Sequence, residues 1–369
     1  MKATTVWRVV YSSVVFISLI ALALWFTSPV RPIKWLPSAS DGLDTKFTPT
    51  SHFSNSLLLE GLGKGPEDIL ISDDGYLYTA YDDGRIIKVP VSSIMEKLQD
   101  AKIGARLNVA HSLVVNTGGR PLGLKFDAAN NLIVADAVKG LLSIDTGGTI
   151  TVLADEHEGQ KLKFVDHLAI DKQGRIWFSD ASSRFDYHNY VYDFIEASAT
   201  GRLMSYNPIS KKTSVHISGL FFANGVTISP KNDFVLINET GRSRIHRYWL
   251  SGDKKGSSDI FIENLPAMPD NIYTKDDTIW VAMVALRDPK VEALAQYPFL
   301  RRLLGGLPRL FLQASSDYAF VLGLNENAEV LHSLQSDEGY QVITAVVEHE
   351  GHLFLGSLQN NAIAVTPLQ

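Results

Sequence analysis

Cysteine is absent from the 369 residues. This absence excludes disulfide bonds, thiolate nucleophiles, iron–sulfur clusters and cysteine-based zinc sites, so any bound metal must have oxygen or imidazole ligands. Runs of basic residues are absent too, because 34 Lys and Arg are scattered among 40 Asp and Glu, for a net charge of -6. A phosphate-binding surface needs clustered positive charge, so no nucleic-acid partner is predicted.

Charged side chains are also missing between Arg8 and Arg31, where the sequence is almost continuously apolar. A stretch of about 20 such residues is long enough to cross a bilayer as a helix. We therefore predict a membrane anchor at residues 1–31, with a cleaved signal peptide as the alternative. Residues 32–46 are rich in proline and lack periodicity, which predicts an extended linker. Basic residues flank the segment on both sides, so they do not decide its orientation.

The remainder, residues 47–369, lacks long helical patterns and instead repeats one strand-turn-strand unit. The copies read PEDILISDDGYLY, PLGLKFDAANNLIV, VDHLAIDKQGRIWF, ANGVTISPKNDFVL, PDNIYTKDDTIW and VITAVVEHEGHLF. Their spacing of roughly 45 to 60 residues, apart from one longer gap, matches a four-stranded propeller blade with its loops. We predict an all-β fold, a six-bladed β-propeller with an N-terminal single transmembrane helix.

One position can be compared across the repeats: the residue eight places before the turn position, which is Gly75 in the first copy. This residue would begin the innermost strand of each blade. The residues there are Glu67, Leu122, Asp166, Asn224, Asp270 and Ile343. Three carboxylates and one amide would then converge at the channel mouth and would repel one another without a cation. Oxygen ligands of this kind suit Ca2+, with another divalent cation as an alternative. The competing interpretation is that these side chains only bind loop backbone.

The longer gap holds a segment of different character, at about residues 286–312. Its Leu and Phe residues have helical spacing with Arg301, Arg302 and Arg309 among them, which predicts an amphipathic basic insertion. Three arrangements are open: the insertion docks on a membrane, lines the entrance to the channel, or packs as a helix on the propeller.

Several stretches together resemble a known superfamily. They are GPEDI (65–69), GRPLGL (119–124), FVDHLAIDKQGRIWFSDASSRF (164–185), GRLMSYNP (201–208), FANGVTIS (222–229), RIHRYWLSG (244–252), MPDNI (268–272) and GHLFLGSL (351–358). The sequence resembles the six-bladed propellers of the gluconolactonase, regucalcin, paraoxonase and strictosidine synthase superfamily. Within it, the sequence is most similar to membrane-anchored strictosidine synthase-like proteins of the adipocyte plasma membrane-associated type.

This resemblance implies a calcium in the channel, and the superfamily's metal-site acids and amides fall on the four polar residues found by register, Glu67, Asp166, Asn224 and Asp270. It brings in Asp68 and Asn271 as secondary candidates, although Asp68 has the alternative role of capping the local turn. Strictosidine synthase uses a glutamate in its sixth blade, and Thr344 stands at that position. Alkaloid synthesis is therefore disfavoured.

The function that these residues predict is calcium-dependent hydrolysis of a lactone or an aryl ester at the channel mouth. Asp270 would activate water, with His167 as the alternative proton carrier unless its ring binds backbone. Arg120 would bind a substrate carboxylate or the oxyanion, unless it forms a salt bridge to a ring carboxylate. The alternative function is a non-catalytic membrane-anchored propeller with structural calcium that binds a partner or small ligand. The resemblance places the propeller on the non-cytoplasmic side, whether periplasmic, lumenal or extracellular.

Overall fold

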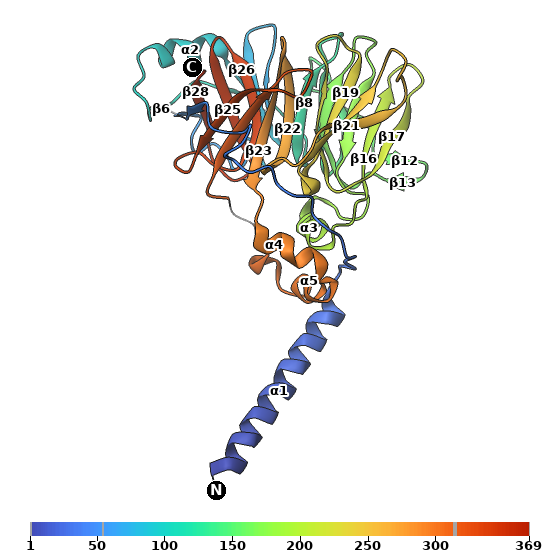
Figure 1. The fold of residues 1–369 in the computed structure, drawn as a ribbon. Helices are drawn as coiled ribbons and strands as arrows, with labels where there is room; N and C mark the ends of the chain where they lie inside the picture. Colours follow the sequence, from blue (N-terminus) through green and yellow to red (C-terminus); the bar gives the residue numbers. More distant parts are fainter. Residues whose placement is uncertain (1, 54, 313–315, 369) are drawn as a thin grey trace.

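The computed structural model describes residues 2–53, 55–312 and 316–368. It contains six sheets of four or five strands, which are antiparallel apart from one short parallel edge strand in each five-stranded sheet. The first strands of neighbouring sheets contact one another around a central channel. The predicted six-bladed β-propeller is therefore confirmed. One long apolar helix, α1 (Lys2–Thr27), projects from one face of the propeller (Figure 1).

Four of the sheets are blades formed from consecutive parts of the chain. From the channel outward, the first blade contains β3 (Ile69–Ile71), β4 (Tyr76–Ala80), β5 (Arg85–Pro90) and β7 (Ser112–Asn116), and the second contains β8 (Pro121–Phe126), β9 (Leu132–Asp136), β10 (Gly140–Ile144) and β11 (Ile150–Ala154). The third contains β14 (Val165–Ile170), β15 (Ile176–Asp180), β16 (Gly201–Asn207) and β17 (Lys212–Leu220). The fourth contains β18 (Ala223–Ile228), β19 (Phe234–Glu239), β20 (Arg244–Trp249) and β21 (Ser258–Ile262). A short hairpin of β12 (Glu156–His157) and β13 (Gln160–Lys161) joins the second blade to the third.

The fifth and sixth blades include strands from the beginning of the chain. The fifth contains β22 (Ala267–Lys275), β23 (Thr278–Leu286), β24 (Ala319–Leu324) and β25 (Val330–Ser336), with β1 (Ser51–His52) at its edge. The sixth contains β26 (Ile343–His349), β27 (His352–Ser357) and β28 (Ile363–Pro367), followed by β2 (Ser56–Leu58) and β6 (Arg106–Leu107). Because β2 pairs with β28, the two ends of the propeller sequence close the ring and leave no open sheet between them.

Packing between blades explains why many strands are apolar on both faces instead of alternating. Every residue of β24 is buried, since its sheet is covered by a blade on each side. Trp280 of the fifth blade, for example, shares a core cluster with Ile343 and Leu355 of the sixth. The hydrophobic core is thus a series of interfaces between neighbouring sheets.

The short helices gather mainly on the face from which α1 projects (Figure 1). They form two groups. The first is the 3-10 turn Tyr187–Asn189 and α3 (Val191–Glu196). The second is α4 (Pro289–Ala293), the 3-10 turn Leu294–Gln296, α5 (Pro298–Gly305) and the 3-10 turn Arg309–Phe311. Each group connects the second strand of a blade to the third. In the same blades Val165 pairs with Asp180 and Ala267 with Leu286, so the second strands end where the first strands begin. The helices and the starts of the first strands therefore share one face. The helix α2 (Val91–Gln99) lies elsewhere, on the first blade after β5.

Helix α1 has the properties of a membrane-spanning segment. Its residues Val6–Thr27 have a mean hydropathy of 2.3, and their side chains are not buried against the protein. No other described helix is both long and apolar enough to cross a bilayer.

The segment after α1, predicted as an extended linker, is extended but lies against the protein. The backbone of Arg31 donates a hydrogen bond of 2.6 Å to Glu196, and that of Asp41 donates one of 3.0 Å to Asn264. The Phe47 side chain is fully buried in the core of the fourth and fifth blades. The linker therefore fixes the propeller to the end of α1.

The burial of Phe47 leads to a stability prediction. Replacing Phe47 with alanine should lower the free energy of unfolding by about 3 to 5 kcal/mol, because it empties a filled core position. Chemical denaturation in mild detergent measures this change. Leu36→Ala, at a side chain that is 77% exposed in the same segment, is the control and should change the free energy by no more than about 0.5 kcal/mol. Equal effects of the two substitutions would show that the segment is not docked.

Candidate metal centre at the channel mouth

The residues of the predicted ring lie at the starts of the first strands. Glu67 comes two residues before β3, and the others lie within the first strands of their blades: Leu122, Asp166, Asn224, Asp270 and Ile343. All six positions are buried. Two of them are apolar and four carry oxygen, so the polar part of the mouth comes from the first, third, fourth and fifth blades.

Irregular pairing at these positions determines where the side chains point. In five of the six blades the register between first and second strand shifts at this level, at Pro121/Gly123, Val165/Leu168, Ala223/Val226, Pro269/Ile272 and Ile343/Ala345. Such bulges turn a side chain away from the regular alternation of a strand. A close approach accompanies one of them, because a Cβ on Gly225 would lie 2.5 Å from the Asp270 carbonyl oxygen. Only glycine fits between these two blades.

The carboxylates of the ring are buried close enough to influence one another electrostatically. Burial raises the pKa of Glu67 well above its usual value, and the neighbouring Asp270 and Asp166 carboxylates raise it further. Burial is also the main cause that raises the pKa of Asp166 to about 8, against the opposing effect of Arg120. The pKa of Asp270 is raised by burial and by the charge of Asp166. Bringing three carboxylates together in a buried place is costly unless protons or a cation neutralise them.

Three oxygen atoms at this mouth lack a hydrogen-bond partner among the described residues: Glu67 Oε2, Asn224 Oδ1 and Asn271 Oδ1. The amide group of Asn271 donates a hydrogen bond of 3.2 Å to Glu67 Oε1, which leaves its own oxygen free. Buried oxygen atoms without partners are rare, and carboxylate and amide oxygens are the ligands that Ca2+ prefers. No three Asp, Glu, His or Cys side chains of the described chain are preassembled as a metal cluster. A cation here would therefore need the amide oxygens beside the carboxylates.

Asp68, a secondary candidate for the metal site, is held by hydrogen bonds that hold the fold together. Its carboxylate accepts hydrogen bonds from the backbone of Ile69 at 2.8 Å and of Leu124 at 2.7 Å, and also from the Tyr273 hydroxyl. These bonds join the first, second and fifth blades. The partners of Asp68 in the second and fifth blades lie beyond the local turn that the capping alternative named, whereas Asn271 lies beside Glu67 at the mouth.

His167 lies inside the channel, where both nitrogen atoms of its ring have polar neighbours. Its Nδ1 accepts a hydrogen bond of 3.0 Å from the Val226 backbone, and its Nε2 lies 3.4 Å from the Tyr273 hydroxyl. Burial and nearby Lys125 lower the pKa of His167 to about 3. A ring that stays neutral and bonded in this way favours the backbone-binding alternative over the hypothesis of a proton carrier.

Arg120 lies at the mouth with two donors unused. Its Nη1 donates a hydrogen bond of 3.0 Å to the Gly65 carbonyl, and its Nε lies 3.6 Å from the Asp82 carboxylate. Nε and Nη2 have no hydrogen-bond partner within the described chain, although the side chain is 1% exposed. Among the described residues, Arg120 forms no salt bridge to a ring carboxylate; its ion pair is with Asp82, outside the ring. The guanidinium is near enough to the ring to lower the pKa of Glu67.

An aromatic rim, which the sequence did not reveal, borders this mouth on the side of the third blade. The Tyr187 hydroxyl donates a hydrogen bond of 2.6 Å to Asp82, and the Tyr187 and Phe164 rings meet edge to face at 5.8 Å. The pKa of Tyr190 is raised by burial, lowered by the charge of Arg309, and raised by the charges of Asp270 and Asp82. The only sequence signal was the long connection in the third blade, between residues 180 and 201.

The channel also has cavities at its far end. One of about 340 Å³ is lined by residues that include His167, Thr227 and Tyr273, and another of about 790 Å³ lies along the later part of β3 and its neighbours. These cavities are reached from the face opposite to the carboxylate ring.

Comparison with known proteins identifies the family. The strictosidine synthase family model matches residues 166–253, and the N-terminal model of strictosidine synthase-like proteins matches residues 55–89. Strictosidine synthase-like protein 4 of Arabidopsis thaliana is 33% identical over 96% of this chain and 94% of its own length. The chain belongs to the strictosidine synthase-like family. The adipocyte plasma membrane-associated protein of Gallus gallus is also 33% identical, over 83% of this chain and 76% of its own length.

Solved structures share the fold of this strictosidine synthase-like protein at low sequence identity. A gluconolactonase from Xanthomonas campestris has a TM-score of 0.59 with 13% identity, over 84% of this chain and 88% of its own. The calcium-binding protein regucalcin from Agrobacterium tumefaciens has a TM-score of 0.53 with 10% identity, over 84% and 94%. These likenesses agree with the six-bladed architecture.

Thr344 has a supporting role in this family member. Its hydroxyl donates a hydrogen bond of 2.8 Å to the Glu67 carbonyl, which holds the backbone of the first blade to the sixth. A neutral hydroxyl that is bonded in this way is a poor general acid or base, so the sixth blade provides no titratable group at this position.

Proposed function

We propose that this strictosidine synthase-like protein is a calcium-dependent hydrolase that cleaves a lactone or an ester at the channel mouth. The observation that carries the proposal is the set of buried oxygen atoms without partners on Glu67, Asn224 and Asn271, next to mutually repelling carboxylates. The gluconolactonase and the calcium-binding regucalcin of the same fold support the choice of reaction and of cation.

The residues that would hold calcium are Glu67, Asp166 and Asp270 through carboxylates, and Asn224 and Asn271 through amide oxygens. When bound, calcium supplies a Lewis acid for the substrate carbonyl and the developing oxyanion. Asp270 is the most exposed of the five, at 8%, and is the residue that takes a proton from the attacking water. The Asn224 amide donates a hydrogen bond to this carboxylate and orients it.

Arg120 completes the proposed site. Its free Nη2 donor offers a second anchor for the carbonyl oxygen or for a carboxylate of the substrate, while Nε faces Asp82. Tyr187 holds Asp82, which in turn lies beside the guanidinium, so the donors stay in place. The rim rings of Phe164 and Tyr190 exclude water around the reacting bond.

The deciding experiment uses the full chain in mild detergent, because the segment after α1 packs on the propeller. Hydrolysis of a panel of aryl esters and lactones is measured before chelation, after chelation and after calcium is restored. Activity that disappears with the chelator and returns with calcium is the expected result. Absence of turnover throughout, with calcium still bound and raising the melting temperature, would instead establish the non-catalytic propeller with structural calcium.

Arg120 allows a more specific prediction. Arg120→Met should lower kcat/KM by about 100-fold, the usual cost of losing one oxyanion donor, without weakening calcium binding, because a positive charge is removed. Arg106→Met, at a side chain 70% exposed on the propeller surface, is the matched control and should leave both unchanged. Measuring kcat/KM and calcium affinity together tests this. A parallel loss of calcium affinity would show that Arg120 only supports the ring.

We further propose that the propeller lies on the non-cytoplasmic side of the membrane, where calcium is abundant. The absence of cysteine makes this testable, since a single introduced thiol is unique. Ile209, 91% exposed on a loop of the third blade, is a suitable position. Ile209→Cys should react with a membrane-impermeant maleimide either in intact cells or only after internal membranes are opened. Labelling that first appears when the plasma membrane alone is permeabilised would place the propeller in the cytoplasm.

A further inference from the structure

The helical insertion between β23 and β24 exposes a set of large apolar side chains. We propose that this insertion, residues 289–312, is a second membrane contact that holds the channel mouth against the bilayer. Its exposed apolar side chains are Val291, Tyr297, Phe299, Leu300, Leu310 and Phe311. Leu310 and Phe311 are 76% and 70% exposed, far more than a helix packed on a protein surface requires.

Direct contact with α1 places the insertion at the level of the bilayer surface. The rings of Trp25 and Phe299 lie 5.3 Å apart, and the Arg302 guanidinium lies 4.1 Å from the Trp25 ring. A Cβ on Gly306 would lie 2.1 Å from the Leu24 carbonyl oxygen, so the two backbones touch where only glycine fits. Leu24 and Trp25 belong to the last turn of the membrane-spanning segment, where a spanning helix reaches the lipid headgroups.

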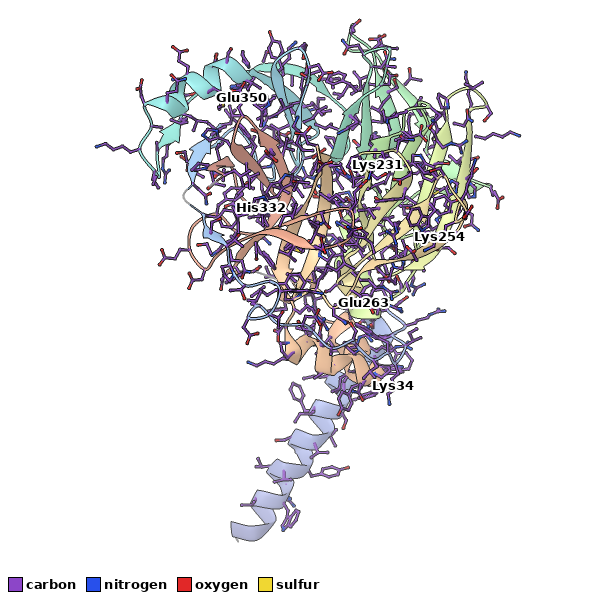
Figure 2. All side chains as sticks on the ribbon, turned by 45° about the horizontal axis from the view of Figure 1, so that its top comes forward. Lys34, Lys231, Lys254, Glu263, His332 and Glu350 are labelled. Carbon is purple, nitrogen blue, oxygen red and sulfur yellow. The ribbon has the colours of Figure 1, made fainter. Side chains whose placement is uncertain are left out.

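The charges around the insertion fit a lipid surface. The one acid among residues 289–312 is Glu292, which is paired with Arg287 at 2.6 Å, whereas Arg302 and the exposed Arg309 are basic. Exposed Lys34 lies where the chain leaves α1 (Figure 2). Apolar side chains next to basic ones, with no unpaired acid among them, are typical of segments that lie in a membrane interface. The continuity with α1 favours the bilayer over a protein partner as the occupant of this surface.

The insertion also reaches the mouth of the channel. Helix α5 packs against α3, where Arg301 Nε donates a hydrogen bond of 2.8 Å to the Ile195 carbonyl. The turn just before α3 carries Tyr187, whose hydroxyl bonds Asp82 at the mouth. The mouth therefore opens beside the lipid headgroups. If the proposed hydrolase activity holds, on which this step depends, the substrate is an amphiphile: an ester or lactone with a long apolar chain that enters from the membrane.

A depth measurement tests the membrane contact without using activity. Phe311→Cys in the full chain, labelled with an environment-sensitive fluorophore, is reconstituted in vesicles that contain nitroxide-labelled lipids. We expect emission at shorter wavelength and strong quenching by the lipids. Ile209→Cys, at a side chain that is 91% exposed on the opposite face, is the control and should show neither. A Phe311→Cys label that is unquenched would overturn the contact, whether it faces water or is shielded by a second copy of the chain.

A substrate comparison tests the route of entry. The double variant Leu310→Asp and Phe311→Asp should lose most turnover of a long-chain ester dispersed in vesicles, yet keep turnover of a short, water-soluble ester. An equal loss on both esters would overturn the route. If the unmodified protein hydrolyses neither ester, the hydrolase proposal fails, and the quenching result alone decides the membrane contact.

Discussion

Glu67→Gln should abolish calcium binding and calcium-dependent hydrolysis together. Glu67 is the one ring residue that is influenced by both other carboxylates and also retains an oxygen atom without a partner. Removal of its charge takes away a principal ligand, so the calcium dissociation constant should rise by at least about 100-fold. Calorimetric titration of calcium into the full chain in detergent, beside an ester assay, measures both effects.

The same substitution should make the calcium-free protein more stable. A glutamine fills the space of the glutamate but does not repel Asp166 and Asp270, so the melting temperature without calcium should rise. Glu350→Gln is the control, because Glu350 is exposed at a turn on the face opposite to α1 (Figure 2). It should change neither calcium affinity nor melting temperature. A Glu67→Gln protein that binds calcium normally would contradict the proposed site.

The second large effect expected is a pH-dependent stability that calcium reverses. The pKa of Asp166 is raised from 3.8 to about 8 by burial, and that of Asp68 from 3.8 to about 7. Between these pKa values the folded protein keeps protons that the unfolded chain releases. The two carboxyl groups therefore contribute fully to the stability of the fold below about pH 4. They lose that contribution as the pH rises toward about 8. Without calcium, the melting temperature should fall over this range.

Calcium should act in the opposite direction, because it binds the ionised carboxylates in competition with protons. The increase in melting temperature on adding calcium should be larger at about pH 8 than at about pH 5. Thermal unfolding of calcium-free and calcium-loaded protein at several pH values measures this. Asp166→Asn should flatten the calcium-free profile. A calcium-free protein whose melting temperature rises steadily from pH 4 to 8 would show that the carboxylates are not neutralised by protons.

The blade architecture was predictable from sequence because each first strand is followed by a turn with Gly, Asn or Asp, which stands at the same place in five of the six copies. These turns gave the register, and the register placed Asp166, Asn224 and Asp270 in the first strands of successive blades. A repeat is informative in this way because each copy reports on the same position in space.

What the sequence could not predict depends on contacts between distant segments. The bulges that direct Asp270 and its neighbours arise from pairing between strands, and the partners of Asp68 come from two other blades. His167 looked available as a base because the short-range pattern contains no sign of the Val226 backbone that binds its ring. The docking of Phe47 and the aromatic rim likewise depend on residues far along the chain.

The docked segment between α1 and the propeller has a mechanical consequence. Because residues 31–47 are attached to the protein by hydrogen bonds and by the buried Phe47 side chain, α1 and the propeller should move as one rigid body. The apolar span Val6–Thr27 has 22 residues, roughly 33 Å at the helical rise, slightly longer than the hydrocarbon layer of about 30 Å. A thinner bilayer tilts such a helix further. The tilt would swing the propeller by the same angle, so the thickness of the membrane would set how closely the mouth faces its surface.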